Sequence, residues 1–594
     1  MKTNSLTLGQ SILTMTSRDP QQAAVKFKSG NKWIEKSWKE YYQDIETLGA
    51  ALLSLGIKAG DRVAIMANTR YEWSVSDYAI FGIKAITVPI YQNNIAEDVE
   101  YILNNSKARF LICESRGPLK TFESIRAKCP HVEKILLMDS SSTESQNISW
   151  TQLMKFGQDY LAKHPTCYKD LCSTLKPDEM ATILYTSGTT GLPKGVVLTH
   201  LQAFNEVSEA FPFAGAVPGD TSLTFLPYAH ILGRIEHWGH LYIGFTMAYA
   251  ESLEKVRNNL ADIRPTILVS VPRIFEKIHS AILAQIQTQP LKLKLFNWAV
   301  EVGREVGEYK LSGEILPLSL LAKYELAKKL VLGKITEAFG GRLRFAISGG
   351  APISKEIAMF FHSAGILILE GYGLTETTAA ITVNTPFNYR FGSVGRPIGD
   401  VELKVAADGE ILVKSAKVMK EYYQNPEATK EAFTDGWFHT GDIGEITKSG
   451  DLRITDRKKD LIKTAGGKYV APQRLETLLV LSPYISHALI HGDQKKYIVA
   501  LIFPDQAAVK MLAQEKGIKF NDWNDLVTSP FVEELIRNAV AETNAQLASY
   551  ESIKKHIIMH NELSVENGEL TPSLKLKRKK LDQKFTAEIE KMYA

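Results

Sequence analysis

Residues 36–115 alternate between helical and strand patterns, and this alternation restricts the possible folds more than any other feature of the sequence. Helical patterns cover residues 38–55, 71–84 and 96–104, and apolar strand patterns cover residues 62–66, 85–90 and 108–113. Strands that alternate with helices in this way predict βαβ units and a parallel sheet. The sequence therefore predicts an α/β protein whose large N-terminal part contains parallel βαβ sheets.

The bulk composition is that of an ordinary globular protein. With 594 residues, 45% of them hydrophobic and 23% charged, the chain can bury several domain-sized cores. The net charge of +4 is small for this length, so no nucleic-acid partner is expected. The cysteines form no CxxC pair, which indicates thiols of a reducing compartment and not a zinc site; they are Cys113, Cys129, Cys167 and Cys172.

Neither a signal peptide nor a membrane span is expected. Residues 1–20 are polar and lack the apolar core of a secretory signal. The sequence contains no run of about eighteen apolar residues, the length that a spanning helix needs. The protein is therefore expected to be cytoplasmic. Peripheral contact with the inner face of a membrane and the oligomeric state both stay open.

The segment at residues 185–195, Tyr-Thr-Ser-Gly-Thr-Thr-Gly-Leu-Pro-Lys-Gly, is dense in glycines and hydroxyls and lies between two predicted strands. Glycines let backbone N–H groups approach an anion, and the hydroxyls and Lys194 add further donors, so the loop suits a polyphosphate. A surface turn rich in Gly and Thr is the alternative. The loop is not a P-loop, because Gly195 instead of Ser or Thr follows Lys194.

The 185–195 segment resembles the phosphate-binding motif of the adenylate-forming enzymes, which include acyl-CoA synthetases, luciferases and adenylation domains. Other segments match motifs of this family in the expected order, at residues 345–352, 371–376, 440–442 and 456–457 and at a late lysine. The resemblance extends over roughly residues 38–580. It implies a large AMP-binding domain at residues 1–455, a hinge at 456–461 and a small, mobile α+β domain at 462–594.

The resemblance implies a nucleotide site built from several separate segments. The phosphates would be bound by Thr186, Ser187, Gly188, Thr189, Thr190, Gly191, Lys194 and Thr375. The adenine would lie on Gly349, Gly350, Ala351, Pro352, Gly371, Tyr372 and Gly373. The ribose would be held by Asp442 and Arg457, and Mg²⁺ would be held by Glu376 and Thr186.

Residue chemistry alone supports part of this assignment. Tyr372, between two glycines, can lay its ring on a flat purine, and Glu376 offers the hard oxygen ligands that suit Mg²⁺. Thr375 can donate to a phosphate. By itself, however, Asp442 after Gly441 indicates a turn aspartate, and a lone Gly-Tyr-Gly fits a turn at the end of a strand.

Two basic segments near the end of the chain have both an ordinary and a catalytic interpretation. By charge alone, residues 456–470 indicate a solvated linker, and residues 575–580 indicate a solvated end or a patch for an anionic surface. The resemblance instead implies that Lys459 is the pivot of the hinge and that Gly466 and Gly467 belong to a loop that approaches the thiol tunnel. It also implies that Lys575 is the catalytic lysine of adenylation, acting with Glu376.

One position departs from the family pattern. The wider family has glycine just before the catalytic lysine, where this chain has Leu574. Long-chain synthetases often lack that glycine, so the departure points to their subfamily. They also have a segment similar to residues 225–234, in which His230 would line the end of the site that holds the acyl carboxylate. By chemistry alone, a histidine among apolar residues indicates a buried core group.

The remaining apolar segments have two interpretations each. Residues 238–250 could line an acyl tunnel or form a plain core helix. In the helical insertion at residues 280–340, one helical face would be formed by Leu295, Trp298, Ala299, Val302, Val306 and Tyr309. This face is expected to pack on its own domain, with a lipid surface as the alternative.

The expected function is ATP-dependent activation of a long-chain fatty acid through an acyl-adenylate, followed by transfer to CoA. ATP, Mg²⁺ and CoA are the implied cofactor and co-substrates, and the partners are small molecules. A fatty acyl-AMP ligase that loads a carrier protein is the nearest alternative. A catalytically inactive binding protein and a membrane-surface scaffold are alternatives from other classes.

Overall fold

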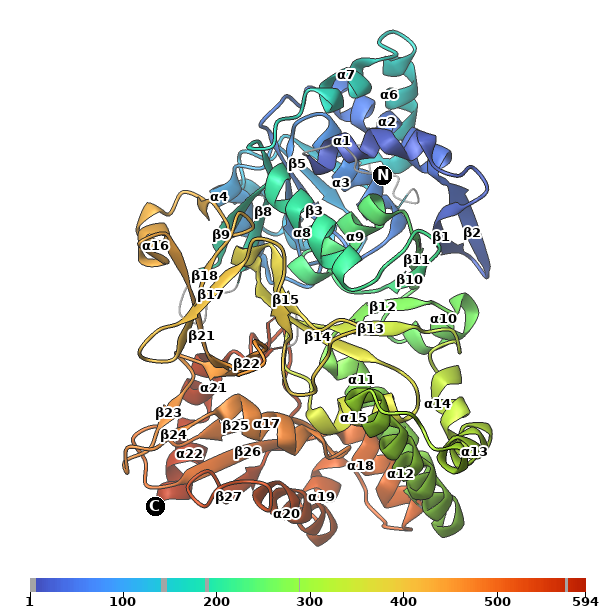
Figure 1. The fold of residues 1–594 in the computed structure, drawn as a ribbon. Coiled ribbons are helices and arrows are strands. Elements are labelled where there is room, and N and C mark those ends of the chain that lie inside the picture. The colour runs from blue at the N-terminus through green and yellow to red at the C-terminus, as the bar shows by residue number, and fades with distance from the viewer. Residues whose placement is uncertain (1–6, 140–146, 187–191, 288, 572–574) are drawn as a thin grey trace.

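The computed structural model describes residues 7–139, 147–186, 192–287, 289–571 and 575–594. Within these residues the strands form sheets of nine, eight, five, three and two strands. Figure 1 shows one large sheet with its helices in the upper part and the other across the middle. The C-terminal part of the chain lies below them in orange and red.

The eight-stranded sheet has the order β19-β9-β8-β4-β3-β5-β6-β7. Its strands are β3 (Arg62–Met66), β4 (Ile86–Ile90), β5 (Phe110–Cys113), β6 (Lys134–Leu137), β7 (Ile148–Ser149), β8 (Met180–Thr186), β9 (Lys194–Thr199) and β19 (Glu421–Tyr422). Strand β3 runs parallel to β4 and β5, and β6 runs parallel to β5. Helix α2 (Trp38–Ser54) precedes β3, and α3 (Tyr71–Gly82) and α4 (Ala96–Ser106) connect the next strands. The predicted parallel βαβ units are confirmed.

The nine-stranded sheet has the order β16-β15-β14-β13-β12-β10-β11-β1-β2. Its strands are β1 (Ala23–Ser29), β2 (Lys32–Ser37), β10 (Thr221–Thr224), β11 (Thr246–Tyr249), β12 (Ile267–Ser270), β13 (Phe345–Ser348), β14 (Ile368–Leu374), β15 (Ala379–Val383) and β16 (Arg396–Pro397). The run from β11 through β14 is parallel, and β15 is antiparallel to β14. In such sheets the carboxyl ends of parallel strands are where ligands bind.

A fully buried cluster of polar residues joins α3 to α9 (Ile231–Ile243). The Arg234 guanidinium lies 2.5 Å from a carboxylate oxygen of Asp77, which also accepts hydrogen bonds from Thr87 and Trp238. Burial acts to raise the pKa of Asp77, but Arg234 and His237 hold it below its ordinary value. Since a buried charge is costly without its partner, this ion pair fixes one face of α9. The other face of α9 is then positioned to line the candidate active site.

The helical insertion comprises α11 (Pro272–Gln287), α12 (Pro290–Ser312), α13 (Leu318–Ala327) and α14 (Gly333–Glu337). Helix α12 packs on α15 (Lys355–Ser363), where a Cβ on Gly303 would lie 2.3 Å from the Ser363 carbonyl oxygen. Packing of this helix on its own domain is therefore confirmed. The predicted face was wrong at Leu295, which is 38% exposed, because the buried stripe runs through Phe296 instead.

The five-stranded sheet brings β21 (Trp437–Ile446) beside β22 (Leu452–Arg457), with Asp442 opposite Arg457 in register. Its other strands are β17 (Glu402–Val405), β18 (Glu410–Lys414) and β20 (Phe433–Thr434). The helices not yet described are α1 (Leu8–Ile12), α5 (Arg116–Glu123), α6 (Trp150–Leu161), α7 (Cys167–Ser173), α8 (His200–Phe213), α10 (Val256–Ile263) and α16 (Pro426–Glu431).

The C-terminal part has hydrophobic clusters of its own on both faces of its three-stranded sheet. The strands are β25 (Ile485–His491), β26 (Ile498–Pro504) and β27 (Ile553–Ile558), after the hairpin β23 (Ile462–Lys463) and β24 (Tyr469–Val470). The helices are α17 (Pro472–Val480), α18 (Gln506–Glu515), α19 (Trp523–Val527), α20 (Pro530–Asn544), α21 (Arg578–Lys584) and α22 (Thr586–Tyr593). The fold class, with its smaller C-terminal α+β domain, is confirmed. In the part of the chain that the structure describes, no helix is long and apolar enough to cross a membrane.

Candidate active site

The predicted adenine residues lie on two neighbouring parallel strands. Residues 349–352 follow β13, and residues 371–373 lie in β14, which pairs with β13. Gly350 has φ of +80°, a conformation that glycine adopts most readily. A Cβ on Gly373 would lie 1.4 Å from the Ala379 carbonyl oxygen, so only glycine lets β14 and β15 approach here. The two glycine-rich segments thus form one edge of the site.

Tyr372 and Arg457 converge on the buried carboxylate of Asp442. The Tyr372 hydroxyl donates a hydrogen bond of 2.6 Å to one carboxylate oxygen, and Arg457 Nε lies 3.5 Å from the other. Burial raises the pKa of Asp442, and Arg457 opposes this shift. The structure thus brings together three predicted nucleotide residues. Sequence reasoning assigned Tyr372 to the adenine and missed its contact with Asp442.

Lys575 reaches this site from the C-terminal part of the chain. Its ammonium donates a hydrogen bond of 2.7 Å to the Gly350 carbonyl oxygen. Its backbone N–H donates a hydrogen bond of 3.0 Å to the Thr571 hydroxyl. The pKa of Lys575 is lowered to about 8, mainly because protein displaces water from the ammonium and next because Arg457 lies nearby; Asp442 opposes the shift.

Arg578 anchors the segment that carries Lys575, and the sequence analysis missed it. Its guanidinium donates to both carboxylate oxygens of Glu476, at 2.6 and 2.8 Å, and to the Ile490 carbonyl oxygen at 2.9 Å. Charge-assisted hydrogen bonds of this kind are stronger than those between neutral groups. Lys580 also has a partner, the Asn567 carbonyl oxygen. Three basic residues of the 575–580 run therefore serve the fold or the site, which weakens its interpretation as a free basic patch.

Tyr422, another residue that the sequence analysis missed, links the predicted phosphate and metal residues. Its hydroxyl donates a hydrogen bond of 2.8 Å to Glu376, and the Lys194 ammonium lies 4.9 Å from the centre of its ring. Thr186 pairs with Lys194 across β8 and β9. The other predicted loop residues, Ser187, Gly188, Thr189, Thr190 and Gly191, lie outside the described residues.

The donor set around Glu376 fits Mg²⁺ bound together with a nucleotide. Across the described ranges, no group of three or more His, Cys, Asp or Glu side chains could hold a metal ion by itself. Mg²⁺ commonly uses one or two carboxylates and takes its remaining ligands from phosphates and water. Glu376 offers such a carboxylate, with Thr375 beside it in the short helical turn Thr375–Thr377 and Thr186 on β8.

An apolar cavity of about 60 Å³ opens beside the predicted adenine residues. Its walls come from α8, α9 and the ends of the strands, and its lining includes Ala210, Phe211, Ala214, His230, Ile231, Leu232, Ile235, Gly349, Gly350, Tyr372 and Val383. His230 caps α9, where its Nδ1 accepts a hydrogen bond of 3.2 Å from the Leu232 N–H. Burial, and to a smaller extent Lys575, lower the pKa of His230 to about 3, so the imidazole is neutral.

The residues predicted for the second step lie elsewhere. Gly466 and Gly467 occupy the exposed turn between β23 and β24, and Lys459 is also exposed. None of the three takes part in the hydrogen bonds around Lys575 within the described part of the chain. Trp238 faces the buried Asp77 cluster and not the cavity. The core-helix interpretation therefore holds there, and the first turns of α9 line the cavity.

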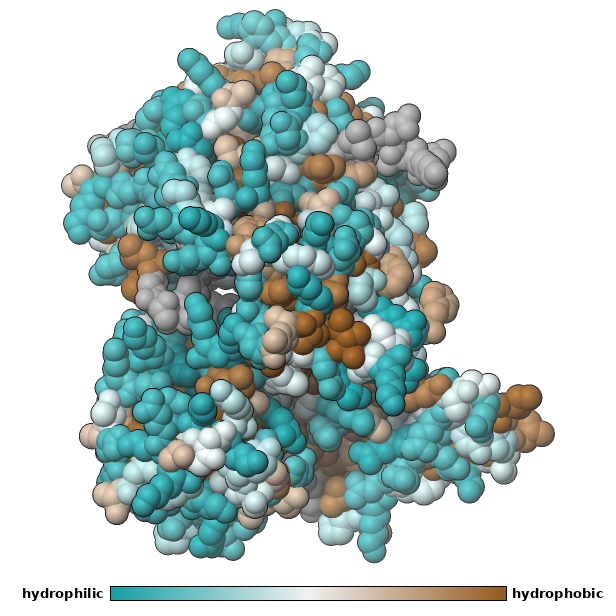
Figure 2. Space-filling model, turned by 60° about the vertical axis from the view of Figure 1, so that its left-hand side comes forward, coloured by the Kyte–Doolittle hydropathy of each residue, from teal (hydrophilic) through white to brown (hydrophobic). Residues whose placement is uncertain are grey.

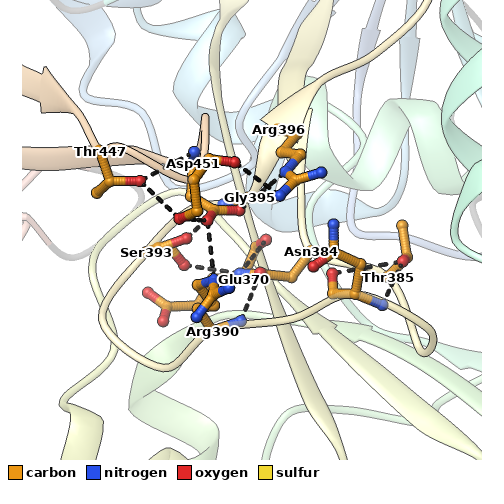
Figure 3. Close-up of polar contacts among 11 residues, drawn as sticks. Glu370, Asn384, Thr385, Arg390, Ser393, Gly395, Arg396, Thr447 and Asp451 are labelled. Carbon is orange, nitrogen blue, oxygen red and sulfur yellow. Dashed lines mark hydrogen bonds and ion pairs between the residues drawn. The ribbon is translucent and has the colours of Figure 1, made fainter. Parts of the chain in front are cut away.

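A polar network holds the loop that follows β15 beside the adenine residues (Figure 3). The Asn384 amide donates a hydrogen bond of 2.6 Å to the Ser393 carbonyl oxygen, and Asp451 pairs with Arg390 and Arg396. Glu370, which precedes Gly371, is buried within this loop. Burial raises its pKa to about 8, although the Ile353 and Gly392 N–H groups oppose the shift.

Family models match nearly the whole chain. The model described as AMP-binding enzyme matches residues 14–423, and the model described as AMP-binding enzyme C-terminal domain matches residues 459–594. The chain belongs to the AMP-binding enzyme family. The resemblance that the motifs carry is thereby confirmed. The exact domain boundaries and the roles of the site residues stay predictions.

Relatives of this AMP-binding enzyme match along nearly its whole length. A long-chain fatty acid–CoA ligase of Mycobacterium bovis is 35% identical over 578 residues, which cover 97% of this chain and 95% of the relative. Fatty acyl-CoA synthetase A of Dictyostelium discoideum is 31% identical, with 95% and 86% of the two chains covered. Long-chain fatty acid–CoA ligase 5 of Rattus norvegicus is 30% identical, with 95% and 84% covered.

Solved structures of lower identity show the same fold. The adenylation domain of a carboxylate reductase from Mycobacterium chelonae matches with a TM-score of 0.76 at 23% identity, covering 100% of this chain and 92% of its own. The corresponding domain from Segniliparus rugosus, in complex with AMP and a co-purified carboxylic acid, matches with a TM-score of 0.74 at 20% identity. It covers 100% of this chain and 95% of its own.

The lowered pKa of Lys575 predicts a pH dependence of ATP binding. The ammonium is charged below pH 8 and loses its charge above, so its attraction for phosphates is present at pH 7 and lost as the pH rises through about 8. We expect the affinity for ATP to fall by roughly tenfold between pH 7 and 9.5, the loss of one charge-assisted hydrogen bond. Isothermal titration calorimetry measures this change. Lys575→Arg keeps its charge and should bind ATP equally at both pH values; the same fall in that variant would exclude Lys575 as its origin.

Proposed function

We propose that this AMP-binding enzyme is an ATP-dependent long-chain fatty acid–CoA ligase, which forms acyl-CoA, AMP and pyrophosphate through an acyl-adenylate. The observation that carries the proposal is the position of Lys575. Its ammonium donates to the Gly350 carbonyl oxygen at the apolar cavity, and its charge interacts with those of Asp442 and Arg457 and with His230. A carboxylate at the mouth of that cavity and a nucleotide on the glycine-rich edge would meet there. Relatives named long-chain fatty acid–CoA ligases, similar over almost the whole chain, support the acyl class.

In the first step a carboxylate attacks the α-phosphate of ATP, and the main obstacle is repulsion between two anions. Preorganised positive charge lowers such a barrier. Lys575 supplies charge where the carboxylate and α-phosphate meet, and Asp442 holds the ribose hydroxyls. Mg²⁺ on Glu376 and Thr186 would supply further charge at the phosphates. The neutral His230 leaves the cavity free of competing charge.

In the second step the CoA thiol attacks the acyl carbon, and AMP leaves. This attack needs space where Lys575 lies, so the proposal includes rotation of residues 462–594 about a hinge at 456–461, with Lys459 as pivot. Rotation would break the Lys575–Gly350 contact, and also the hydrogen bond of 3.1 Å from Arg273 on α11 to the Ser486 carbonyl oxygen on β25. The turn with Gly466 and Gly467 would then approach the acyl-adenylate.

A fatty acyl-AMP ligase that loads a carrier protein shares the first step and stays the alternative acceptor class. The catalytically inactive alternative requires loss of the charged site residues, whereas Glu376, Asp442, Arg457 and Lys575 are all present. The partners in this proposal are fatty acid, ATP and CoA. The proposed location is the cytoplasm, with peripheral contact at the inner face of a membrane.

The helical insertion supports the peripheral contact. Of the 20 exposed large hydrophobic side chains among the described residues, eight lie between residues 291 and 330. Two of the most exposed are Ile315, at 94% in the connection between α12 and α13, and Leu318, at 84% in the first position of α13. Figure 2 shows hydrophobic residues gathered at the end of a projection. Lys310 and Lys323 flank the connection and suit an anionic lipid surface.

Thioester formation across a series of fatty acids tests the proposed reaction. With ATP, Mg²⁺ and CoA, we expect acyl-CoA to form from palmitic acid with a kcat/KM well above that for acetic or benzoic acid, because the cavity is lined mainly by apolar side chains. Chromatographic detection of acyl-CoA and AMP measures both products. Release of pyrophosphate without any acyl-CoA would favour the carrier-loading alternative. No turnover of ATP with any carboxylic acid would overturn the proposal.

Vesicle co-sedimentation tests the peripheral contact. We expect the wild type to bind vesicles that contain phosphatidylglycerol, and we expect the double variant Ile315→Ser/Leu318→Ser to bind them at least roughly tenfold more weakly, since it loses two inserted side chains. Leu253→Ser/Met511→Ser removes exposed hydrophobic groups outside the insertion and is the matched control. Equal binding by both double variants would contradict docking through the α12–α13 connection.

A further inference from the structure

Lys417 is a fully buried lysine whose partners lie next to the turn that carries Glu376. Its ammonium lies 3.4 Å from a carboxylate oxygen of Glu206 and 3.0 Å from one of Glu209. It also donates a hydrogen bond of 3.2 Å to the Ala380 carbonyl oxygen. An ammonium has three N–H donors, and these three oxygens match them in number. We call Lys417, Glu206 and Glu209 the Lys417 cluster.

The Lys417 cluster joins three segments of the chain. Glu206 and Glu209 lie on α8, and Lys417 lies between β18 and β19. The third segment is the start of β15, where the Ala380 N–H donates a hydrogen bond of 2.9 Å to Glu206. Ala380 is therefore held through both its N–H and its carbonyl oxygen. Because a buried charge is costly without its partners, the cluster holds these segments in one arrangement.

The turn that carries Glu376 has a strained backbone. Thr378 and Ala379 have φ of +57° and +84°, which residues other than glycine rarely adopt. Such a backbone persists only where the surrounding structure holds it. The Thr378 hydroxyl donates a hydrogen bond of 2.6 Å to the Lys417 carbonyl oxygen, and the Met419 N–H donates one of 2.6 Å to the Glu376 carbonyl oxygen. The segment of Lys417 thus contacts the turn before and within its strained part, and the Lys417 ammonium contacts it after.

The position of the Glu376 carboxylate depends on this same segment. Tyr422, five residues after Lys417, donates the hydrogen bond of 2.8 Å to that carboxylate. The segment is in turn held by α8, through the Lys417 ammonium and through a hydrogen bond from the Gln202 amide to the Val418 carbonyl oxygen. Mg²⁺ demands near-ideal octahedral geometry, so a small displacement of Glu376 would weaken its binding.

We propose that Lys417, with Glu206 as its partner, is a positioning residue that holds the turn at residues 375–379 so that Glu376 can bind the Mg²⁺ of a bound nucleotide. The inference rests on the proposed function, because ATP with Mg²⁺ is the ligand that it assigns to Glu376. Lys417 itself does not touch this ligand. It acts through the backbone of the turn.

Calorimetric titration of ATP, once with Mg²⁺ and once with EDTA, tests the proposal. The ratio of the two dissociation constants measures how much Mg²⁺ strengthens ATP binding, and we call this ratio the Mg²⁺ gain. In Lys417→Met the Mg²⁺ gain should fall by roughly tenfold, while the affinity in EDTA stays within about twofold of the wild type, since only the metal contact is lost.

Thermal unfolding verifies that each variant is folded. Lys417→Met leaves Glu206 without its cation, which is destabilising in a buried site. If this variant does not fold, Lys417→Met/Glu206→Gln removes both charges and should show the same fall in the Mg²⁺ gain. Failure of both variants to fold would assign Lys417 to the fold alone and overturn the inference.

Two further comparisons separate positioning from a general loss of stability. Glu376→Gln should lower the Mg²⁺ gain as Lys417→Met does, and Lys417→Met/Glu376→Gln should lower it no further than Glu376→Gln, because Lys417 acts through Glu376. Arg344→Met is the matched control. Arg344 also pairs with a buried carboxylate, that of Asp220, but it precedes β13, at the end away from the glycine-rich edge. Its Mg²⁺ gain should equal that of the wild type.

An unchanged Mg²⁺ gain in a folded Lys417→Met variant would overturn the inference. An equal fall in Arg344→Met, or a further fall in Lys417→Met/Glu376→Gln, would overturn it as well. So would a wild type that binds ATP equally tightly with Mg²⁺ and with EDTA, because Glu376 would then hold no metal. A wild type that binds no ATP under either condition would refute the proposed function itself.

Discussion

The hydrogen bond from the Lys575 ammonium to the Gly350 carbonyl oxygen joins residues that are 225 positions apart, and the candidate site depends on it. This hydrogen bond depends on the positive φ of Gly350 in the large domain. It also depends on the anchored segment of the C-terminal domain that carries Lys575. The Arg578–Glu476 pair provides that anchor inside the small domain. The Lys575–Gly350 hydrogen bond joins the large domain to the C-terminal domain, so the proposed rotation of the C-terminal domain would remove the Lys575 charge from the candidate site.

The charges around this contact suit a reaction between anions. Arg457 and Lys575 both lie near the buried Asp442, and the pKa of Lys575 is lowered by desolvation of its ammonium and by its crowding with Arg457. A bound phosphate would relieve that crowding by giving both cations a partner. Elsewhere in the candidate site, Tyr422 contacts both Lys194 and Glu376, which are the predicted phosphate and metal residues. The proposal therefore assigns the fixed Lys194 to the phosphates and the movable Lys575 to the bond that forms.

Much of this arrangement could be predicted from the sequence because it follows local patterns. The alternation at residues 36–115 predicted parallel strands, and strand-end glycines predicted the edge that contains Tyr372. Contacts between side chains that are far apart in the sequence produce no local sequence pattern. Only the tertiary fold pairs Arg578 with Glu476 and Tyr422 with Glu376. It is also the tertiary fold that buries Glu370. Leu295 was assigned to the wrong face because periodicity does not fix the exact centre of a buried stripe.

The measurement that tests the central claim most directly is a comparison of the two half-reactions in Lys575→Ala. Formation of acyl-adenylate from palmitic acid and ATP should fall by roughly a hundredfold or more, the usual effect of removing a group that stabilises transition-state charge. Thioester formation from supplied palmitoyl-adenylate and CoA should stay close to the wild-type rate. Lys579→Ala, at an exposed position in α21, is the control and should leave both rates unchanged. Equal loss of both half-reactions in Lys575→Ala would contradict a movable lysine that serves only the first step.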